Sequence, residues 1–283
     1  MALLKLISMQ SSFFRFGSYT FQIELCEAFS SYSFEHWKDY RVSSIPSNVY
    51  TLFVTLTTLP RIREITSGWF FDKCADRNHL TYYNASIPLF SLEYGKNIDK
   101  ITIQVANKDE RSLLLGIQFA MLLVLAPHAI GLHGVTTICK NRVVILSAPS
   151  GTGKTTLSNL LQRHCKAAVI NGDFALLSFH NKLGVLYHPT PFCGTSGITH
   201  NHTLPVSHIV FLEQGNKNCY TSLNSRQALV HLMSNSFIPH WDEEIFVQLQ
   251  SILMDIVEHV TVGLYTFLPE RHAAEILHEI VTM

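Results

Sequence analysis

A glycine-rich turn followed by a lysine and two threonines is the part of this sequence best suited to chemistry. Residues 143–156 read VVILSAPSGTGKTT. They match the phosphate-binding pattern G-x-x-x-x-G-K-[ST], except that Ala148 stands at the first glycine position. Gly151 and Gly153 permit backbone angles that turn amide groups toward phosphate oxygens. The pattern therefore predicts a site for a nucleoside triphosphate.

The residue types around this turn suggest individual roles. We expect the side chain of Lys154 to reach the β- and γ-phosphates, and the hydroxyl of Thr155 to bind Mg²⁺. The N-terminus of a following helix would add partial positive charge. ATP and Mg²⁺ are the expected cofactors. The expected nucleotide-binding residues are Pro149, Ser150, Gly151, Thr152, Gly153, Lys154, Thr155 and Thr156.

A strand and a helix must hold this turn in place. The run 143–146 is short, β-branched and apolar, which predicts a buried strand, and residues 156–164 continue as a helix. Residues 130–139 and 142–146 are expected to form a hairpin. This context favours a phosphate site over a glycine turn that binds nothing.

A carboxylate follows the next buried strand. Residues 167–170 are apolar, and Asn171, Gly172 and Asp173 come directly after them. An acid that binds Mg²⁺ or acts in catalysis is expected at such a position after a phosphate loop. Asn-Gly-Asp is also strong turn chemistry, so a purely structural turn is an equal alternative.

Other polar residues carry less specific signals. The irregular stretch 188–204 contains His188, His200 and His202. A long irregular segment is often functional, so we expect a lid or a substrate loop. The spacing of the histidines fits no strong zinc pattern. Glu213, at the end of a later buried strand, is a second candidate for contact with Mg²⁺ or water.

Composition excludes some classes of partner. The 283 residues include 21 basic and 21 acidic ones, and no run of Lys or Arg occurs, so we expect no nucleic-acid partner. The most apolar stretch, 113–126, is shorter than the ~20 residues that span a membrane, so we expect no membrane insertion. Charged residues make up only 15%, which favours a homo-oligomer or another partner.

The cysteines and the first residues indicate a cytoplasmic protein. Six cysteines occur and none forms C-x-x-C, so we expect reduced, buried thiols. The N-terminal stretch lacks a charged region before its apolar residues and a small-residue cleavage site, so a signal peptide is not expected.

The order of the elements predicts two domains. Residues 1–108 look β-rich, with strands at 16–25, 49–56, 69–72 and 101–105, and we expect an accessory or substrate-docking domain. Residues 109–283 alternate strands and helices and form the expected nucleotide-binding domain. The predicted fold class is α/β, with a mixed sheet and flanking helices preceded by a smaller β-rich domain. The later elements are expected at 225–234, 242–259, 260–268 and 269–281.

Several segments together resemble a known family. These segments are His133-Gly134-Val135, Asp173, residues 190–194 and the strand 208–214. The combination resembles the HPr kinase/phosphorylase family, whose P-loop core is shared with phosphoenolpyruvate carboxykinase. The likeness is greatest to the smaller HPr-kinase-like proteins that phosphorylate a serine of lasso-peptide precursors. It covers about 129–214.

The resemblance implies roles for three residues. Asp173 would be the general base and a metal ligand, His133 would lie near the transferred phosphate, and Lys154 would also act in catalysis. Gly172 stands where the family usually has another acid, so one contact to Mg²⁺ or phosphate is in doubt. A histidine hydrogen-bonded in the core is the alternative for His133. The arginine-bearing phosphorylase loop is not found, which argues against HPr as substrate.

The expected function is an ATP-dependent kinase. It would transfer the γ-phosphoryl group to a Ser or Thr hydroxyl of a peptide or protein, in particular a ribosomally synthesised precursor peptide. One alternative is a nucleotide-binding module without catalysis that recruits a peptide or partner enzyme. Others are a carboxykinase-like enzyme acting on a small carboxylic acid, and a generic P-loop hydrolase or metabolite kinase.

Overall fold

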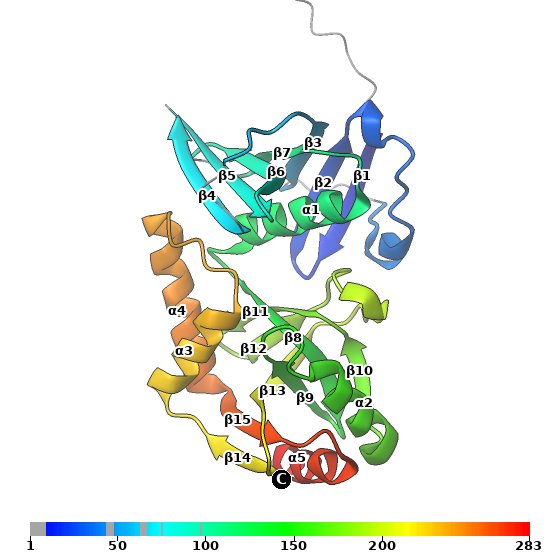
Figure 1. The fold of residues 1–283 in the computed structure, drawn as a ribbon, viewed down its shortest axis with the longest axis vertical. Coiled ribbons are helices and arrows are strands. Elements are labelled where there is room, and N and C mark those ends of the chain that lie inside the picture. Colours follow the sequence, from blue (N-terminus) through cyan, green and yellow to red (C-terminus); the bar gives the residue numbers. More distant parts are fainter. Residues whose placement is uncertain (1–9, 44–47, 63–66, 75, 97) are drawn as a thin grey trace, which may run out of the picture. The chain divides into compact units, whose positions relative to one another are not determined.

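The computed structural model describes residues 10–43, 48–62, 67–74, 76–96 and 98–283. The chain divides into two compact units, Met1–Val124 and Leu125–Met283. Each unit has a sheet of its own, and Figure 1 shows their elements. Most of the N-terminal stretch assessed for a signal peptide lies outside the described residues.

In its described residues, the first unit is built on a seven-stranded mixed sheet in the order β1-β2-β3-β7-β6-β5-β4. The central strands β2, β3 and β7 run parallel, and the outer pairs are antiparallel. Two short 3₁₀ helices, η1 (Glu27–Phe29) and η2 (Glu35–Tyr40), follow β2. The strands are β1 (Gln10–Phe16), β2 (Tyr19–Leu25), β3 (Tyr50–Leu56), β4 (Ser67–Cys74), β5 (Arg77–Asn84), β6 (Ile87–Tyr94) and β7 (Lys100–Val105).

The expected β-rich character of the N-terminal part is confirmed, with differences in detail. The stretch 16–25 was expected to be one strand, but a turn at Gly17 (φ 60°) separates β1 from β2. The pattern also missed β5 and β6. These two form a meander with β4, and their side chains alternate less clearly between polar and apolar.

Helix α1 (Glu110–Leu125) packs on the sheet of the first unit. A methyl group on its Gly116 would meet Phe90 and Ile103, so the helix backbone lies directly on β6 and β7. The ring of Phe119 lies 4.7 Å from that of Trp69. The division between units therefore falls after Val124 rather than at the expected 108/109, because α1 shares the core of the first sheet.

The second unit contains an eight-stranded sheet with flanking helices. The strands are β8 (Ile130–Cys139), β9 (Arg142–Ser147), β10 (Ala168–Asn171), β11 (Phe174–His180), β12 (Gly184–His188), β13 (Leu204–Gln214), β14 (Cys219–Ser222) and β15 (Thr261–Phe267). The helices are α2 (Lys154–Cys165), η3 (Gly194–Ser196), α3 (Ser225–Asn235), α4 (Glu243–His259) and α5 (Arg271–Thr282).

Part of this sheet closes on itself. The pairs β8–β11, β11–β12, β12–β13, β13–β9 and β9–β8 form a small barrel. β10 extends it beside β8, and β15 and β14 extend it beside β13. Strands β9, β13 and β15 are parallel, so their carboxyl ends share one edge. The glycine-rich turn leaves β9 at that edge.

A hydrophobic cluster fixes α2 on the sheet. Leu157 of α2 and Leu277 of α5 are fully buried with Leu146 of β9 and Val210 of β13. Burial of one such side chain stabilises a fold by about 1.5–3 kcal/mol. This packing holds the start of α2, and therefore Lys154, against the end of β9. The expected α/β class, with a mixed sheet and flanking helices, is confirmed.

The ends of the later helices refine the sequence expectations. Asn224 caps α3 and forms a capping box with Gln227. Asp242 caps α4, because its side chain accepts a hydrogen bond from the backbone amide of Ile245 at 3.2 Å. α5 begins at Arg271 rather than at the expected 269, with Glu270 at its N-cap position.

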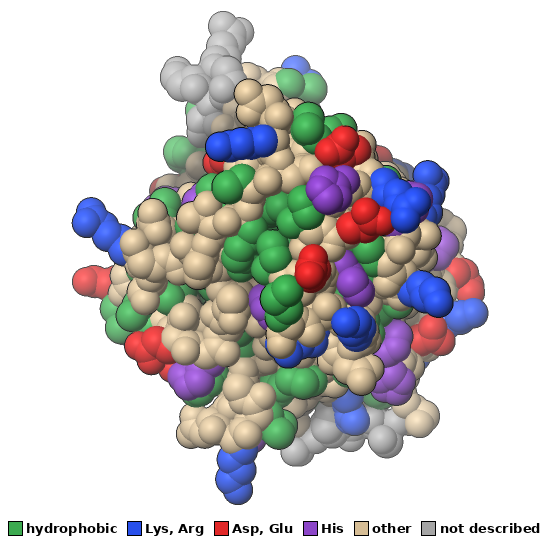
Figure 2. Space-filling model, turned by 90° about the horizontal axis from the view of Figure 1, so that it is seen from below, with side chains coloured by type: hydrophobic (Ala, Val, Ile, Leu, Met, Phe, Trp, Pro, Cys, Tyr) green, Lys and Arg blue, Asp and Glu red, His purple; other side chains and the backbone are tan. Residues whose placement is uncertain are grey.

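The thiols and the surface give further detail. All six cysteines are free, but Cys139 alone is buried, and Cys74 and Cys219 are exposed. In the face shown in Figure 2, basic and acidic side chains are interspersed, with histidines among them. No helix within the described residues has the length and hydropathy needed to cross a membrane.

Candidate active site

The glycine-rich turn, residues 148–155, forms a loop at the N-terminus of α2, here called the phosphate loop. Gly153 occupies the N-cap position at φ 108°, a conformation that other residues rarely adopt, and it offers no side-chain acceptor to the helix amides. The Thr152 hydroxyl donates to the Pro149 carbonyl at 3.0 Å. Gln214 at the end of β13 donates to the Gly151 carbonyl at 3.4 Å. The loop is therefore fixed while the helix amides lack a side-chain partner, as an anion site requires.

Lys154 lies inside the loop rather than on the surface. The residue is 8% exposed, and its ammonium group donates to the carbonyls of Ala148 at 2.7 Å and Pro149 at 3.1 Å. Burial lowers the pKa of Lys154, and the charge of Asp173 acts in the opposite direction. Two backbone carbonyls thus hold the ammonium group inside the phosphate loop. Thr155 and Thr156 are exposed in the first turn of α2.

A tight turn after β10 positions Asp173. The side-chain oxygen of Asn171 accepts hydrogen bonds from the backbone amides of Asp173 at 3.0 Å and Phe174 at 2.9 Å. Its amide group donates to the Thr190 carbonyl at 3.4 Å. Asn171 is fully buried, so these bonds are shielded from water. The expected turn chemistry is confirmed, and the turn presents the carboxylate of Asp173, whose role in catalysis or Mg²⁺ binding stays a prediction.

His133 lies beside this carboxylate. Nδ1 of His133 is 3.5 Å from Oδ1 of Asp173, and the amide of Gly134 donates to the Asp173 carbonyl at 2.9 Å. Burial lowers the pKa of His133 from its ordinary 6.5, the charge of Lys154 lowers it further, and Asp173 opposes both. The imidazole is therefore neutral at pH 7. The alternative of a core histidine does not describe it, since its side chain is 38% exposed.

The structure thus brings the three expected catalytic residues together from three separate segments. His133 comes from β8, Lys154 from the phosphate loop and Asp173 from the turn after β10. The carboxylate of Asp173 is 41% exposed, so a hydroxyl group from outside can reach it. A cation for phosphates, an accessible base and a neutral partner for that base are the groups that phosphoryl transfer uses.

A short segment, residues 193–197, packs against the Asp173 turn. A methyl group on Gly172 would overlap the side chain of Ser196, and one on Gly194 would lie 2.9 Å from Cβ and Cγ of Asp173. The Ser196 hydroxyl donates to the Cys193 carbonyl at 2.7 Å, which holds the segment in shape. This packing explains in physical terms why glycine occupies position 172, where no larger side chain fits.

The histidines of the irregular stretch 188–204 have local roles. His188 is buried, and its Nε2 lies 2.7 Å from the Ser178 hydroxyl. The rings of His200 and His202 are 4.8 Å apart. Among the described residues, no group of three or more His, Cys, Asp or Glu side chains could hold a metal ion.

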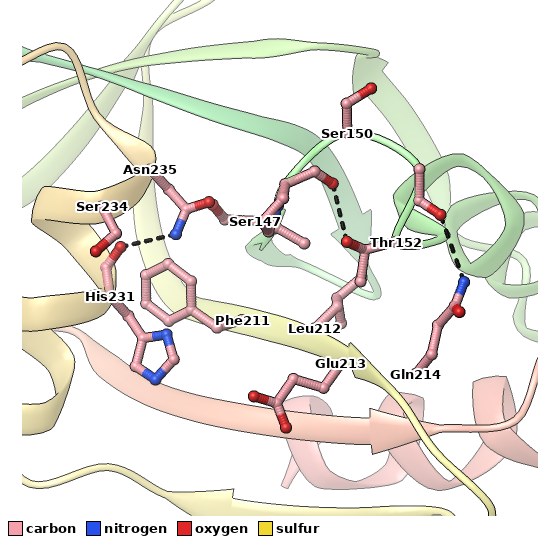
Figure 3. A pocket seen from close by; sticks show the side chains of 13 residues that line it. Ser147, Ser150, Thr152, Phe211, Leu212, Glu213, Gln214, His231, Ser234 and Asn235 are labelled. Atoms are coloured by element: carbon pink, nitrogen blue, oxygen red, sulfur yellow. Dashed lines mark hydrogen bonds between the residues drawn. The ribbon is translucent and has the colours of Figure 1, made fainter.

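A cavity of about 650 Å³ opens on the other side of the phosphate loop. Figure 3 shows residues 147–152, the end of β13 and the last turn of α3 around it. Glu213, the second candidate acid, lines this cavity, but Lys154, Asp173 and His133 do not. The loop therefore separates the cavity from the three catalytic candidates, because β9 lies between β13 on one side and β8 on the other.

The donor set at the loop fits Mg²⁺ bound together with a nucleotide. Thr155 offers a hydroxyl and Asp173 a carboxylate, and both side chains are accessible. Mg²⁺ commonly takes only one or two protein oxygens and completes its octahedron with phosphates and water. This pair is too small a set for a metal site without phosphates.

Two supporting residues were not singled out by sequence reasoning. Asn171 was considered only as part of the turn, although an Asn two residues before the acid is the usual signal for such a side-chain cap. Ser147 donates from its hydroxyl to the His133 carbonyl at 2.8 Å and ties β9 to β8 beside the site. Nothing in the local sequence marks Ser147, because its partner is set by strand pairing.

Comparison with known proteins gives a distant likeness to solved structures. No protein-family model and no curated protein matches the chain. Among solved structures, the chain is similar to the HPr(Ser) kinase/phosphatase from Coxiella burnetii, with a TM-score of 0.30 and 10% sequence identity. The match covers 54% of this chain and 88% of that one. A likeness of this size carries no argument about activity.

Proposed function

We propose that this protein is an ATP-dependent kinase that phosphorylates a Ser or Thr hydroxyl of a peptide or protein. The observation that supports it best is the convergence of Lys154, Asp173 and His133 at one end of the phosphate loop. Lys154 and the helix amides suit phosphate oxygens, and Asp173 and His133 suit the acceptor hydroxyl. We further propose an HPr-kinase-like core for the second unit.

In the proposed reaction, the acceptor oxygen attacks the γ-phosphorus and the bond from that phosphorus to the β,γ-bridging oxygen breaks. The bridging oxygen leaves with the electron pair as part of ADP. The hydroxyl proton moves to the carboxylate of Asp173. Transfer of this kind depends mainly on position and charge neutralisation. Lys154 supplies positive charge at the phosphates, and the loop amides donate hydrogen bonds to them.

Neutral His133 would act as a positioning residue for Asp173. Its ring stands 3.5 Å from the carboxylate without adding a full positive charge that would make the base weaker. Mg²⁺ held by Thr155 and Asp173 would neutralise charge on the phosphates when bound. The segment 193–197 lies against Asp173 and would form one wall for the acceptor peptide.

The finer substrate proposal is a ribosomally synthesised precursor peptide. The resemblance of His133, Asp173 and the stretch 190–194 to lasso-peptide tailoring kinases motivates it. The exposure of Asp173 is compatible with a macromolecular acceptor.

Mass spectrometry tests the proposed function. The protein would be incubated with Mg-ATP and a precursor peptide encoded beside its gene, in parallel with the same peptide carrying Ala at every Ser and Thr. We expect a gain of one phosphate on the first peptide and none on the second. ATP binding without transfer to this peptide or to a Ser/Thr peptide library would instead favour the nucleotide-binding module.

A further inference from the structure

The cavity beside the phosphate loop is not used by the transfer chemistry described above. It is about 650 Å³ in volume, which is within the range of pockets for small organic ligands. Its walls are the loop residues 147–152, the end of β13 at 211–214, and His231, Ser234 and Asn235 of α3. One wall is therefore the same backbone that would hold phosphates.

Strand order sets the direction in which a nucleotide would extend. β10, which leads to Asp173, pairs with β8, and β13 lies on the opposite side of β9. If the γ-phosphorus of a bound triphosphate lies near Asp173, its nucleoside end therefore extends toward the β13 side of the loop. The cavity is located on that side.

The far wall of the cavity offers an aromatic surface. The rings of Phe211 and His231 are stacked, with centroids 4.9 Å apart and planes at 27°. Phe211 is buried at 2% exposure, whereas His231 is partly exposed and lines the cavity. A planar base can extend this stack on the open face of the imidazole.

The cavity wall also carries polar groups from Asn235 and Glu213. The amide nitrogen of Asn235 donates to the His231 carbonyl at 2.9 Å, so its oxygen is turned away from that bond (Figure 3). A side-chain amide oxygen can accept a hydrogen bond from an exocyclic amine such as that of adenine. Glu213 is exposed at the cavity. Its carboxylate would repel phosphate but would accept hydrogen bonds from ribose hydroxyls, as an acidic residue does in other nucleotide-binding sites.

We propose that this cavity binds the nucleoside half of an adenine nucleotide. The base stacks on His231, Asn235 accepts from its amine and Glu213 binds the ribose. This inference rests on the proposed function, because it assigns the remaining part of the same ATP molecule. It goes beyond that function by naming the base and the residues that select it.

Calorimetric binding of ATP, GTP and inorganic tripolyphosphate tests the proposal. Tripolyphosphate shows whether the loop is intact, since it has no nucleoside. We expect His231→Ala to weaken ATP binding at least about fivefold, as loss of a base stack does, with unchanged tripolyphosphate binding. Ser234→Phe, which fills the cavity, should act in the same way. Asn235→Ala should reduce the preference for ATP over GTP.

Val230→Ala is the matched control, because Val230 is exposed on the same helix and does not line the cavity. It should change none of these affinities. Unchanged ATP affinity in both His231→Ala and Ser234→Phe would overturn the proposal. An equal loss of ATP binding and tripolyphosphate binding in these variants would overturn it as well. Wild-type protein that binds tripolyphosphate as tightly as ATP would overturn the cavity proposal alone. Absence of binding for both ligands would overturn the proposed function as well.

Discussion

Nδ1 of His133 lies 3.5 Å from Oδ1 of Asp173, although 39 residues of sequence, a phosphate loop and a helix separate the two. The pairing of β8 with both β10 and β11 produces this proximity, because the Asp173 turn connects those two strands across His133. Because the charge of Lys154 also acts on His133, the proposed base, its neighbour and the loop cation belong to one candidate site.

Replacement of Lys154 by alanine should weaken both ATP binding and transfer. The ammonium group is buried at the phosphate loop, where the proposed function places the phosphates, and hydrogen bonds to charged groups contribute about 1.5–3 kcal/mol, or roughly 10- to 100-fold in affinity. Titration calorimetry and transfer rates would measure the two effects. Lys182→Ala, at an exposed lysine in the turn between β11 and β12, should change neither.

Asn171→Ala should slow transfer while leaving ATP affinity nearly unchanged. It removes the acceptor for two backbone amides of the turn that carries Asp173, and a buried group without its partner costs about 1–3 kcal/mol. We expect lower thermal stability and a lower kcat.

Asn171→Asp distinguishes positioning from simple damage. Aspartate keeps an acceptor for both amides but places a second carboxylate beside Asp173. A like charge raises the pKa of a carboxyl group, so the acidic limb of the pH–rate profile should move to higher pH. An unmoved profile, with kcat equal to that of the wild type, would show that Asn171 has no influence on the base.

Gly172→Asp should not improve the enzyme, even though it supplies the acid that related motifs carry. The new side chain would overlap Ser196, and overpacking of this kind costs about 1–3 kcal/mol. We expect a lower melting temperature and reduced transfer. Adding Ser196→Gly should restore part of the stability, and Gly95→Ala, where the nearest atom lies 3.9 Å away, is the control. Full activity in Gly172→Asp alone would contradict the described packing.

Stability should fall as the pH decreases below about 6.5. Burial lowers the pKa of His188 and of His208, and nearby Arg142 adds to the effect at His208. The unfolded chain therefore binds more protons than the folded one in this range, so stability is complete above the ordinary pKa of 6.5 and is lost as the pH falls through the folded values. Each pH unit by which folding lowers the pKa of such a histidine corresponds to about 1.4 kcal/mol of folding stability.

Melting temperatures measured between pH 5 and pH 8 would check this. His188→Gln removes one titrating group and should flatten the slope below pH 6.5. His164→Gln, at an exposed histidine of α2, should leave the slope unchanged. A slope that is identical in His188→Gln and the wild type would exclude His188 as a source of the acid sensitivity.

The parts of the site that the sequence predicted are those determined by local patterns. The β-branched run before the glycines, the lysine after them and the apolar residues before Asn171 each specify a strand, a turn or a helix start on their own. The β8–β9 hairpin around Lys140 was predicted for the same reason, since polar turn residues separate two apolar runs.

The remaining features depend on contacts between distant segments. Ser196 lies over Gly172, and His231 stacks on Phe211, only because the barrel brings these elements together. The boundary between the units could not be predicted from local sequence patterns either. An apolar stretch such as 113–126 predicts a buried helix, but it does not say which sheet the helix covers.

The most direct test of the central claim separates ATP binding from transfer in Asp173→Asn. This variant keeps the size of the side chain but removes the base. Loss of a general base lowers rates by about 10²- to 10⁴-fold, and we expect the transfer rate to fall by this amount. The ATP affinity should stay within about threefold of the wild type, because ATP binding depends mainly on the phosphate loop. Glu258→Gln, at an exposed acid on α4, should retain both. Transfer by Asp173→Asn at the wild-type rate, or an equal loss of ATP binding and transfer, would contradict the account.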